Sequence, residues 1–405
     1  MGDINDMNDK NNLRTMSAAS RLWVAVTDVW PPFCVQMVVE GDGKIGLCDM
    51  EHAVELASNV NPGARFIRKG HLSMSKWIDS EITPPVREVD GSHWSGYNQE
   101  GAPFLMDFLD INRGPSSEVL LVRGKPERII FRSHHAVMDA RGTTTWAEDI
   151  FRVLRGEEPI GSDCRAIEDD LLNLSTAVEK PLPQRYIIPA ERAVTGDGYV
   201  WRRKHIEGKF SNLLPHIMCL VAGEAWKYNE GKARIGVPVD LRSRRPGFRS
   251  TGNLTNAIFF NINQGTTPEE LAADMKTRLK EKNDGITTWE DRIVKFIPLA
   301  ILKKIISKEC ESSKRTGQYR YTAFVSNLGK IPPGLYSTEE YRTRSIFYIP
   351  QCNEWLPFFM TAQGNENGAD ILLTMPFCYG GHGKIDNLME NITEKLKKEG
   401  VPASA

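Results

Sequence analysis

The residues best suited to chemistry are two adjacent histidines, His134 and His135, and an aspartate that follows them, Asp139. The chain has only eight histidines, and this pair stands where a predicted strand gives way to a loop. A histidine held in one tautomer at such a place is the usual general base near neutral pH. It could take a proton from an amine or hydroxyl group that attacks a carbonyl carbon, without a protein nucleophile. The carboxylate of Asp139 could orient the imidazole, or could hold the loop by pairing with an arginine elsewhere.

The residues of this cluster leave other interpretations open. The three side chains could bind a metal ion, but adjacent histidines on an extended backbone point to opposite sides. A Ser-His-Asp hydrolase would need a nucleophile elbow, and the sequence has no G-x-S-x-G motif. It has neither a P-loop nor a G-x-G-x-x-G motif, and the GGHGK stretch that begins at Gly380 lacks the P-loop spacing. The simplest alternative is a pair of structural histidines at the end of a strand.

A β-hairpin is expected to present the two histidines. Its strands are EVLLVRG (118–124) and RIIFRSH (128–134), joined by a short turn. The loop after them contains Gly142, which would let the backbone turn. A helix is predicted next, with a capping box from Thr145 to Glu148 and a stop at Gly156.

Strands and helices alternate along the rest of the chain, without a literal internal repeat. Apolar runs or alternation predict strands at 35–41, 64–70, 233–242, 256–263, 321–329, 345–350, 358–364 and 370–376. Apolar stripes predict helices that begin near Asp49, Asn212, Thr267 and Ile385, a hairpin turn at 365–368 and a final stop at Gly400. This order indicates an α/β fold of sandwiches with mixed sheets and not a regular βαβ winding.

The length of 405 residues predicts two domains, because single cores rarely grow beyond about 250–300 residues. The expected division is a disordered lead-in (1–18), an N-terminal half with the histidines (19–165), a linker (166–205) and a C-terminal half (206–405).

Composition argues against several classes of protein. The 51 basic and 52 acidic residues give a net charge of −1, which does not indicate a nucleic-acid or membrane partner. The seven cysteines are odd in number and form no CxxC pair, which argues against a disulfide framework or a structural zinc site. The N-terminus has no apolar core of a signal peptide, and no apolar run reaches about 18 residues. The cytoplasm is therefore the expected compartment.

The stretch RIIFRSHHAVMDARGTTTWAEDIFRVL strongly resembles the core of the condensation-domain superfamily. That group includes condensation domains of nonribosomal peptide synthetases, plant-type acyltransferases, wax ester synthases and chloramphenicol acetyltransferase. Its signature, HHxxxDG, follows a hairpin and precedes a helix. Other segments resemble the family in order over roughly residues 30–395: FLDINRGPSSEVLLVRG, RIGVPVDLRSR, GNLTNAIFFNI, FVSNLG and DILLTMPFCYGG. The resemblance implies two chloramphenicol-acetyltransferase-like α/β sandwich halves with a tunnel at their interface.

The resemblance also implies roles for individual residues. His135 matches the catalytic second histidine, and His134 matches the first, whose role is mainly structural. Asp139 matches the aspartate that pairs with an arginine and keeps the loop in shape. Arg242 is the candidate partner, with a surface arginine as the alternative. Three further residues would lie near the seam, around the reacting carbonyl or in structural turns: Asn253, Ser326 and Asn327.

The function that the resemblance implies is transfer of an acyl group from a pantetheine thioester to an amine or hydroxyl acceptor. The donor would be acyl-CoA or an acyl or peptidyl carrier protein, with no metal and no bound cofactor. The length favours a free-standing condensation enzyme of natural-product assembly. Ala140 stands where the family has glycine, which puts the donor geometry in doubt, and the missing DFGWG motif disfavours the plant-type branch. The alternative is a catalytically silent domain that binds a carrier protein or recruits a partner enzyme.

Overall fold

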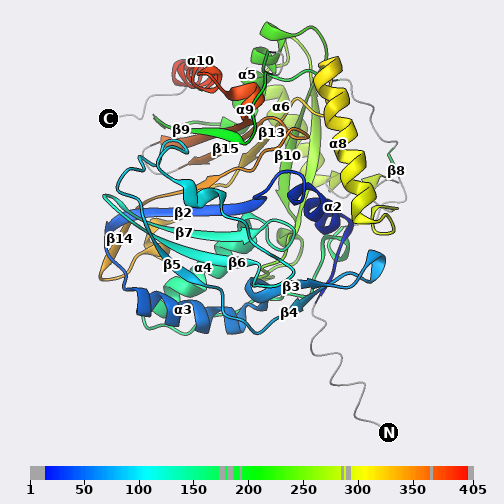
Figure 1. Cartoon of the computed structure of the whole chain (residues 1–405). Helices are drawn as coiled ribbons and strands as arrows, with labels where there is room; N and C mark the ends of the chain where they lie inside the picture. The colour runs from blue at the N-terminus through cyan, green and yellow to red at the C-terminus, as the bar shows by residue number, and fades with distance from the viewer. Residues whose placement is uncertain are drawn as a thin grey trace.

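The fold consists of two stacked α/β halves, each built around one mixed sheet (Figure 1). The computed structural model describes residues 14–172, 178–179, 186–191, 194–283, 287–288, 293–364 and 368–399. The expected α/β class with mixed sheets is confirmed. The predicted stop at Gly400 and most of the predicted turn at 365–368 lie outside these residues. Over the same residues, no helix combines the length and the apolar character needed to cross a bilayer.

The first half contains a five-stranded sheet in the order β14-β2-β7-β6-β5. Its strands are β2 (Cys34–Gly43), β5 (Val86–Asp90), β6 (Ser117–Arg123), β7 (Glu127–His134) and β14 (Tyr341–Ile349). The central strand β7 pairs antiparallel with β2 and β6, so the predicted hairpin is confirmed. Helices α3 (Leu47–Val60) and α4 (Ala140–Leu154) cover one face, where Phe131 packs with Trp146. Every residue of β7 is buried, although only Ile129, Ile130 and Phe131 are apolar. Its two buried arginines are paired, Arg128 with Glu40 and Arg132 with Glu118.

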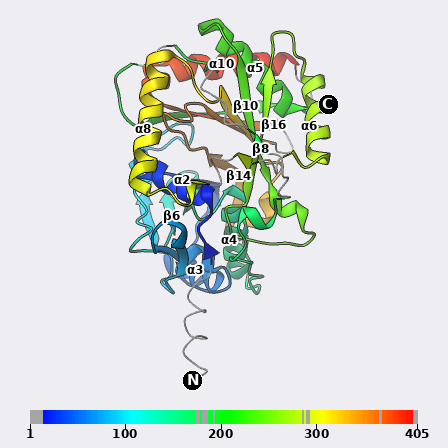
Figure 2. The same ribbon diagram turned by 90° about the vertical axis from the view of Figure 1, so that its right-hand side faces the viewer.

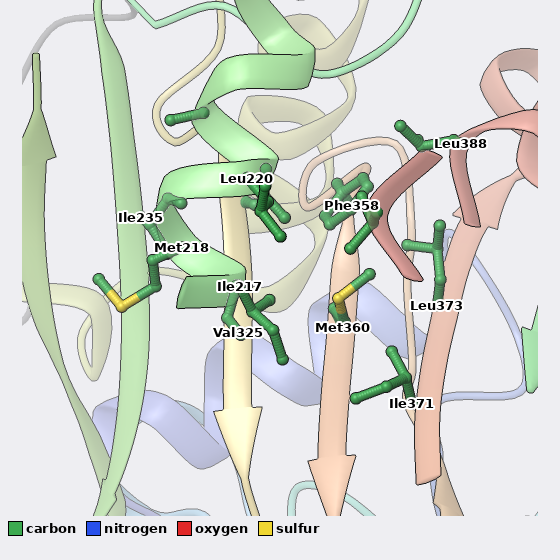
Figure 3. Close-up of a cluster of buried hydrophobic side chains, with 14 of the residues drawn as sticks. Ile217, Met218, Leu220, Ile235, Val325, Phe358, Met360, Ile371, Leu373 and Leu388 are labelled. Carbon is green, nitrogen blue, oxygen red and sulfur yellow. The ribbon is translucent and has the colours of Figure 1, made fainter. Parts of the chain in front are cut away.

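The second half contains a six-stranded sheet in the order β11-β10-β13-β15-β16-β9. Its strands are β9 (Tyr199–Glu207), β10 (Ala233–Asp240), β11 (Thr255–Ile262), β13 (Ala323–Asn327), β15 (Phe359–Gly364) and β16 (Gly368–Pro376). Helices α5 (Leu213–Tyr228) and α10 (Lys384–Glu399) pack on it, and Figure 3 shows Ile217 and Leu220 of α5 beside Val325 of β13. Helix α6 (Pro268–Lys280) packs on α5 and begins with the predicted capping box at Thr267.

Two strands depart from the predicted domain ranges. Strand β14 comes from the predicted C-terminal half, 206–405, but pairs with β2 at the edge of the first sheet. Strand β9 begins inside the predicted linker, 166–205, and pairs with β16 at the edge of the second sheet. A local apolar pattern indicates a strand, but the tertiary structure decides which sheet edge receives it. The two halves are therefore interleaved in sequence.

Two helices without a sequence prediction lie side by side near the seam between the halves (Figures 1 and 2). They are α2 (Ala18–Thr27) and α8 (Leu299–Thr316). Ala25 and Val26 of α2 form an apolar cluster with Leu302 and Ile306 of α8. The first half thus contacts helix α8 through α2.

The last residues of the predicted disordered lead-in belong to the fold. Residues 14–18, within the predicted disordered segment 1–18, are ordered, whereas residues 1–13 lie outside the described residues. Strand β1 (Arg14–Thr15) pairs antiparallel with β4 (Lys76–Asp79), which in turn pairs with β3 (Phe66–Lys69). Ser17 then caps α2 by accepting a hydrogen bond from the Ser20 N–H at 3.1 Å. Further short elements are β8 (Val178–Glu179), β12 (Thr287–Thr288) and α9 (Phe377–Gly380), besides several single turns of 3-10 helix.

Helix α4 begins five residues before its predicted capping box. Asp139 is the N-cap, because its Oδ1 accepts the Gly142 N–H at 2.7 Å. Aspartate is among the strongest N-caps, and it competes successfully with the weaker local signal at Thr145. Thr145 lies inside the helix, where its hydroxyl donates to the Arg141 carbonyl at 3.0 Å. The predicted stop is confirmed, since Gly156 follows the helix with a φ of 76°.

Candidate active site

His134 is the last residue of the central strand β7, and its side chain is fully buried. Its Nδ1 accepts the Ala136 N–H at 3.1 Å, so the neutral ring carries its proton on Nε2. That Nε2 lies 3.1 Å from the hydroxyl of Thr27, which donates onward to the carbonyl of Trp23 at 2.8 Å. Burial, with a smaller contribution from the charge of His135, lowers the pKa of His134 to about 3. His134 is therefore neutral, with both ring nitrogens in hydrogen bonds.

His135 begins the turn after β7 and is half-buried. Its N–H donates to the Phe33 carbonyl at 3.1 Å. The ring stacks on Trp23, with centroids 5.6 Å apart, and on Phe33, with centroids 5.5 Å apart. Desolvation lowers the pKa of His135 below its usual value; its own backbone carbonyl and the charge of Asp139 oppose this shift without cancelling it. The imidazole is thus neutral near physiological pH and able to accept a proton.

The prediction that His134 and His135 point to opposite sides assumed that the extended backbone includes both residues. The strand ends at His134, so the alternation of an extended backbone does not continue to His135. Both rings reach α2, where His134 contacts Thr27 and His135 stacks on Trp23 one turn earlier. No group of three potential metal ligands occurs among the residues that the structure describes.

Asp139 turns away from His135 and forms the predicted ion pair with Arg242 across the seam. Its Oδ1 lies 3.0 Å from Nη2 of Arg242, and its Oδ2 lies 3.1 Å from Nη1. The N–H of Leu254 and the hydroxyl of Thr255 donate to Oδ2 at 2.7 and 2.8 Å. Desolvation acts to raise the pKa of Asp139, but the charge and hydrogen bonds of Arg242 and the N–H donors around it lower the pKa overall. The carboxylate is ionised and holds the loop in place; its contacts do not reach the His135 ring.

Gly142 is required for a reason other than the predicted turn. Its φ is not positive, and it lies in the first turn of α4. A Cβ atom at this position would come within 2.7 Å of the Thr251 carbonyl oxygen and 2.9 Å of the Gly252 carbonyl oxygen. Glycine therefore lets the start of α4 approach the backbone of the second half. Ala140, at the family's glycine position, is the first residue of the helix and is half-buried.

The other predicted site residues lie in different places. Asn253 belongs to the site, because its Nδ2 donates to the His135 carbonyl at 2.9 Å. Ser326 is buried in β13 opposite Thr361 of β15, and Asn327 accepts the Gly329 N–H at 2.9 Å in the turn that follows. No hydrogen bond or ring contact within the described part of the chain joins Ser326 or Asn327 to His135. Their place around a reacting carbonyl stays a prediction.

The residues that the sequence did not reveal come from the unpredicted helix α2 and the segments around it. Trp23 and Phe33 stack on His135, and Trp355 packs edge-on against Trp23 with centroids 6.4 Å apart. Arg21, which is buried, donates to the carbonyls of Leu72 and Ile297, each at 2.6 Å, and so joins the two halves. The available signal was the run RLWVAV after a Ser N-cap, which has the pattern of a buried helix.

Comparison with known proteins shows a similarity of structure only. No family model and no curated protein matches the chain. Solved structures do match over nearly the whole length. The starter condensation domain of rhizomide synthetase RzmA, as a mutant in complex with C8-CoA, has a TM-score of 0.64 and 11% identity, covering 97% of this chain and 95% of that chain.

Two further solved structures agree with this match. A mutant of the same starter domain in complex with C8-CoA and Leu-SNAC has a TM-score of 0.62 and 12% identity, covering 99% of this chain and 98% of that chain. The X-domain from teicoplanin biosynthesis has a TM-score of 0.61 and 10% identity, covering 96% and 94%. At such identities the likeness concerns the backbone and not the chemistry. The chain has the fold of the condensation domains.

Proposed function

We propose that the protein is an acyltransferase that moves an acyl group from a pantetheine thioester to an amine or hydroxyl acceptor, with His135 as general base. The observation that carries the proposal is the state of His135 at the end of the central strand. Its ring is held against Trp23 and Phe33, and desolvation keeps it neutral. Nδ1 is buried, which leaves Nε2 to take the proton.

In the proposed reaction, the acceptor nitrogen or oxygen attacks the thioester carbonyl while His135 Nε2 removes its proton. The tetrahedral oxyanion then collapses, the carbon–sulfur bond breaks, and the imidazolium returns the proton to the leaving thiolate. Acyl transfer of this kind needs no protein nucleophile. Much of the acceleration would come from holding the two substrates in line with the base.

The supporting residues act through the loop that carries His135. Asp139 and Arg242 fix its C-terminal end, and Asn253 binds the His135 carbonyl. Asp139 accepts hydrogen bonds from protein donors on both oxygens, so we assign it a positioning role instead of a part in proton transfer. A tunnel between the halves, open to the donor on one side and to the acceptor on the other, is part of the proposal.

The fold relatives support a class of donor. The rhizomide synthetase starter domain was captured with C8-CoA, and also with Leu-SNAC, which is an amine compound. We propose by analogy that this chain takes acyl-CoA or an acyl carrier protein as donor and an amine or alcohol as acceptor, in natural-product assembly.

The test is release of free thiol by the wild type and by His135→Ala, with acyl-CoA and acyl-carrier-protein donors offered to mixed amines and alcohols. We expect donor-dependent turnover that falls by about 10²–10⁴ in the variant, the usual contribution of a general base. The matched control is His52→Ala, which removes an exposed histidine on α3 and should leave turnover unchanged. Equal turnover of wild type and His135→Ala would exclude His135 as the base. Binding of a carrier protein without turnover of any donor would instead support the silent-domain alternative.

A further inference from the structure

The turn 135–137 depends on partners outside itself for its three carbonyl groups. Asn253 Nδ2 donates to the His135 carbonyl at 2.9 Å, and Ser20 Oγ donates to the Ala136 carbonyl at 2.7 Å. Nη2 of Arg14 donates to the Val137 carbonyl at 2.8 Å. Buried backbone carbonyls are rarely left without a donor, so these three side chains complete the hydrogen bonding of the turn. Two of the three come from the N-terminal segment 14–33.

The same segment also holds the N-terminal side of the turn. The His135 N–H donates to the Phe33 carbonyl at 3.1 Å, and the His134 ring lies 3.1 Å from the hydroxyl of Thr27. Each residue from His134 to Val137 is thus bonded to a different residue of one continuous stretch, 14–33. Strand β1 anchors the start of that stretch, since Arg14 pairs with Trp77 of β4.

Arg14 places a positive charge in the buried surroundings of the turn 135–137. The residue is only 4% exposed, and within the described residues its guanidinium makes no ion pair. It lies 5.0 Å from the ring of Phe66, and its Nη1 is buried without a hydrogen-bond partner. Burying a cation costs free energy unless it is paired or hydrogen-bonded. Nearby acidic groups, Glu168 and Asp139 among them, offset part of this cost. The charge-assisted hydrogen bond to Val137, which is stronger than a neutral one, offsets a further part.

In the second half, the absence of a side chain at Gly252 leaves space for the Arg14 guanidinium. A Cβ atom at Gly252 would lie 3.0 Å from Nη1 of Arg14, so glycine at that position lets the two groups approach. The Gly252 carbonyl accepts a hydrogen bond from Nη2 of Arg242, the partner of Asp139. Arg14 therefore lies where the turn, the Asp139–Arg242 ion pair and the second half meet.

We propose that Arg14 is a positioning residue of the reaction, which fixes the turn 135–137 so that the His135 ring stays against Trp23 and Phe33. Ser20 serves the same purpose at the neighbouring carbonyl. This inference rests on the proposed function of His135 for its effect on rate, and it has a structural consequence that does not depend on catalysis. Loss of the cation leaves the Val137 carbonyl without a donor, and the turn then samples other conformations.

The first experiment compares steady-state kinetics of the wild type, Arg14→Met, Arg14→Lys and Ser20→Ala, at a temperature where each is folded. Methionine keeps the length and apolar stem of arginine but removes the donor, whereas lysine restores a cationic donor. We expect Arg14→Met to lower kcat about 10–100-fold while KM for the donor changes less than about threefold, because the base moves and the binding surface stays. Arg14→Lys should recover part of the loss, and Ser20→Ala should lower kcat about 3–10-fold, a smaller effect because a neutral donor is lost.

The matched control is Arg113→Met, which removes an arginine whose side chain is 90% exposed and should leave kcat unchanged. Folded Arg14→Met with wild-type kcat would overturn the proposal. If Arg14→Met does not fold, Ser20→Ala decides by the same criterion, and unchanged kcat in that variant would overturn the proposal equally.

The second experiment separates this inference from the proposed function. The protein is labelled with ¹³C at the histidine rings, and the His135 signal is assigned as the one lost in His135→Ala. We expect that signal to shift or broaden in Arg14→Met and to stay as in the wild type in Arg113→Met, because the turn loosens only in the former. A changed signal in a protein without thiol release would uphold the positioning role while the proposed function fails. An unchanged His135 signal would overturn the positioning role, whatever the activity.

Discussion

Asp139, the N-cap of α4, and Asp149 within that helix accept hydrogen bonds from arginines of one segment of the second half in nearly the same way. Asp139 accepts five hydrogen bonds, two of them from Arg242. Asp149 also accepts five, two of them from Arg249. Ten residues along a helix correspond to about 15 Å, so the two ion pairs join the halves at well-separated points.

The surroundings of the two pairs differ. Both side chains of the Asp139 pair are about 5% exposed or less, and the pair closes the loop that carries His135. Asp149 is fully buried, but Arg249 is 21% exposed, and the remaining donors to Asp149 are Asn61, Ile160 and Gly161. The same chemistry therefore joins the halves in both places, but only the first pair also holds the loop that carries His135.

The largest difference is expected from matched substitutions to asparagine. Asp139→Asn should destabilise the fold by about 3–5 kcal/mol, because it leaves Arg242 buried with less compensation. It should also lower kcat/KM about 100-fold, since the loop loses its anchor. Asp149→Asn should destabilise by about 1–3 kcal/mol and change kcat/KM by less than about threefold. Urea unfolding and thiol-release kinetics measure the two effects.

An equal loss of activity in Asp139→Asn and Asp149→Asn would contradict a special role for the Asp139 pair. The ion pairs would then act together on the docking of the halves, and Asp139 would have no special hold on the loop.

A smaller effect is expected at Gly142, where α4 approaches the second half. Gly142→Ala places a methyl group against the Thr251 carbonyl, so the helix start must move away. We expect a destabilisation of about 1–3 kcal/mol, as for other overpacked sites, and a loss of activity of about tenfold. The control is Gly223→Ala in α5, where a Cβ meets nothing within 4 Å and should stabilise by up to about 1 kcal/mol. Thermal unfolding of both variants measures the contrast, and equal behaviour would show that the close approach is unimportant.

The smallest effect is a dependence of stability on acid pH. The pKa of Asp139 and that of Asp149 are both lowered in the folded protein, because their arginines and N–H donors outweigh desolvation. Each carboxylate therefore stabilises the fold fully above its unfolded pKa of about 3.9, and this stability is lost as pH falls through the lower, folded value. The stability gap between wild type and either asparagine variant should shrink as pH falls from 5 towards 3, when followed by urea unfolding. A constant gap would mean that charge contributes nothing at that position.

Part of the candidate site could be predicted from the sequence. The hairpin, His134, His135 and the pairing of Asp139 with Arg242 followed from local signals and from a resemblance that spans much of the chain. The start of α4 did not, because the N-cap strength of Asp139 outweighed a capping box at Thr145. The role of Gly142 was also misjudged, since its close neighbour comes from residues more than 100 positions away.

By itself the sequence determined the elements whose signals are local: the buried strands, the helical stripes, and two histidines at the end of a hairpin strand. Only the tertiary structure decided which sheet edge receives β14 and which aromatic rings meet His135. It also decided that the carbonyls of the turn are bound by Arg14 and Ser20. The physical reason is that the hydrogen-bond partners and ring contacts of a buried turn depend on distance in space. Residues that are far apart in the chain have no local sequence pattern that indicates their contact.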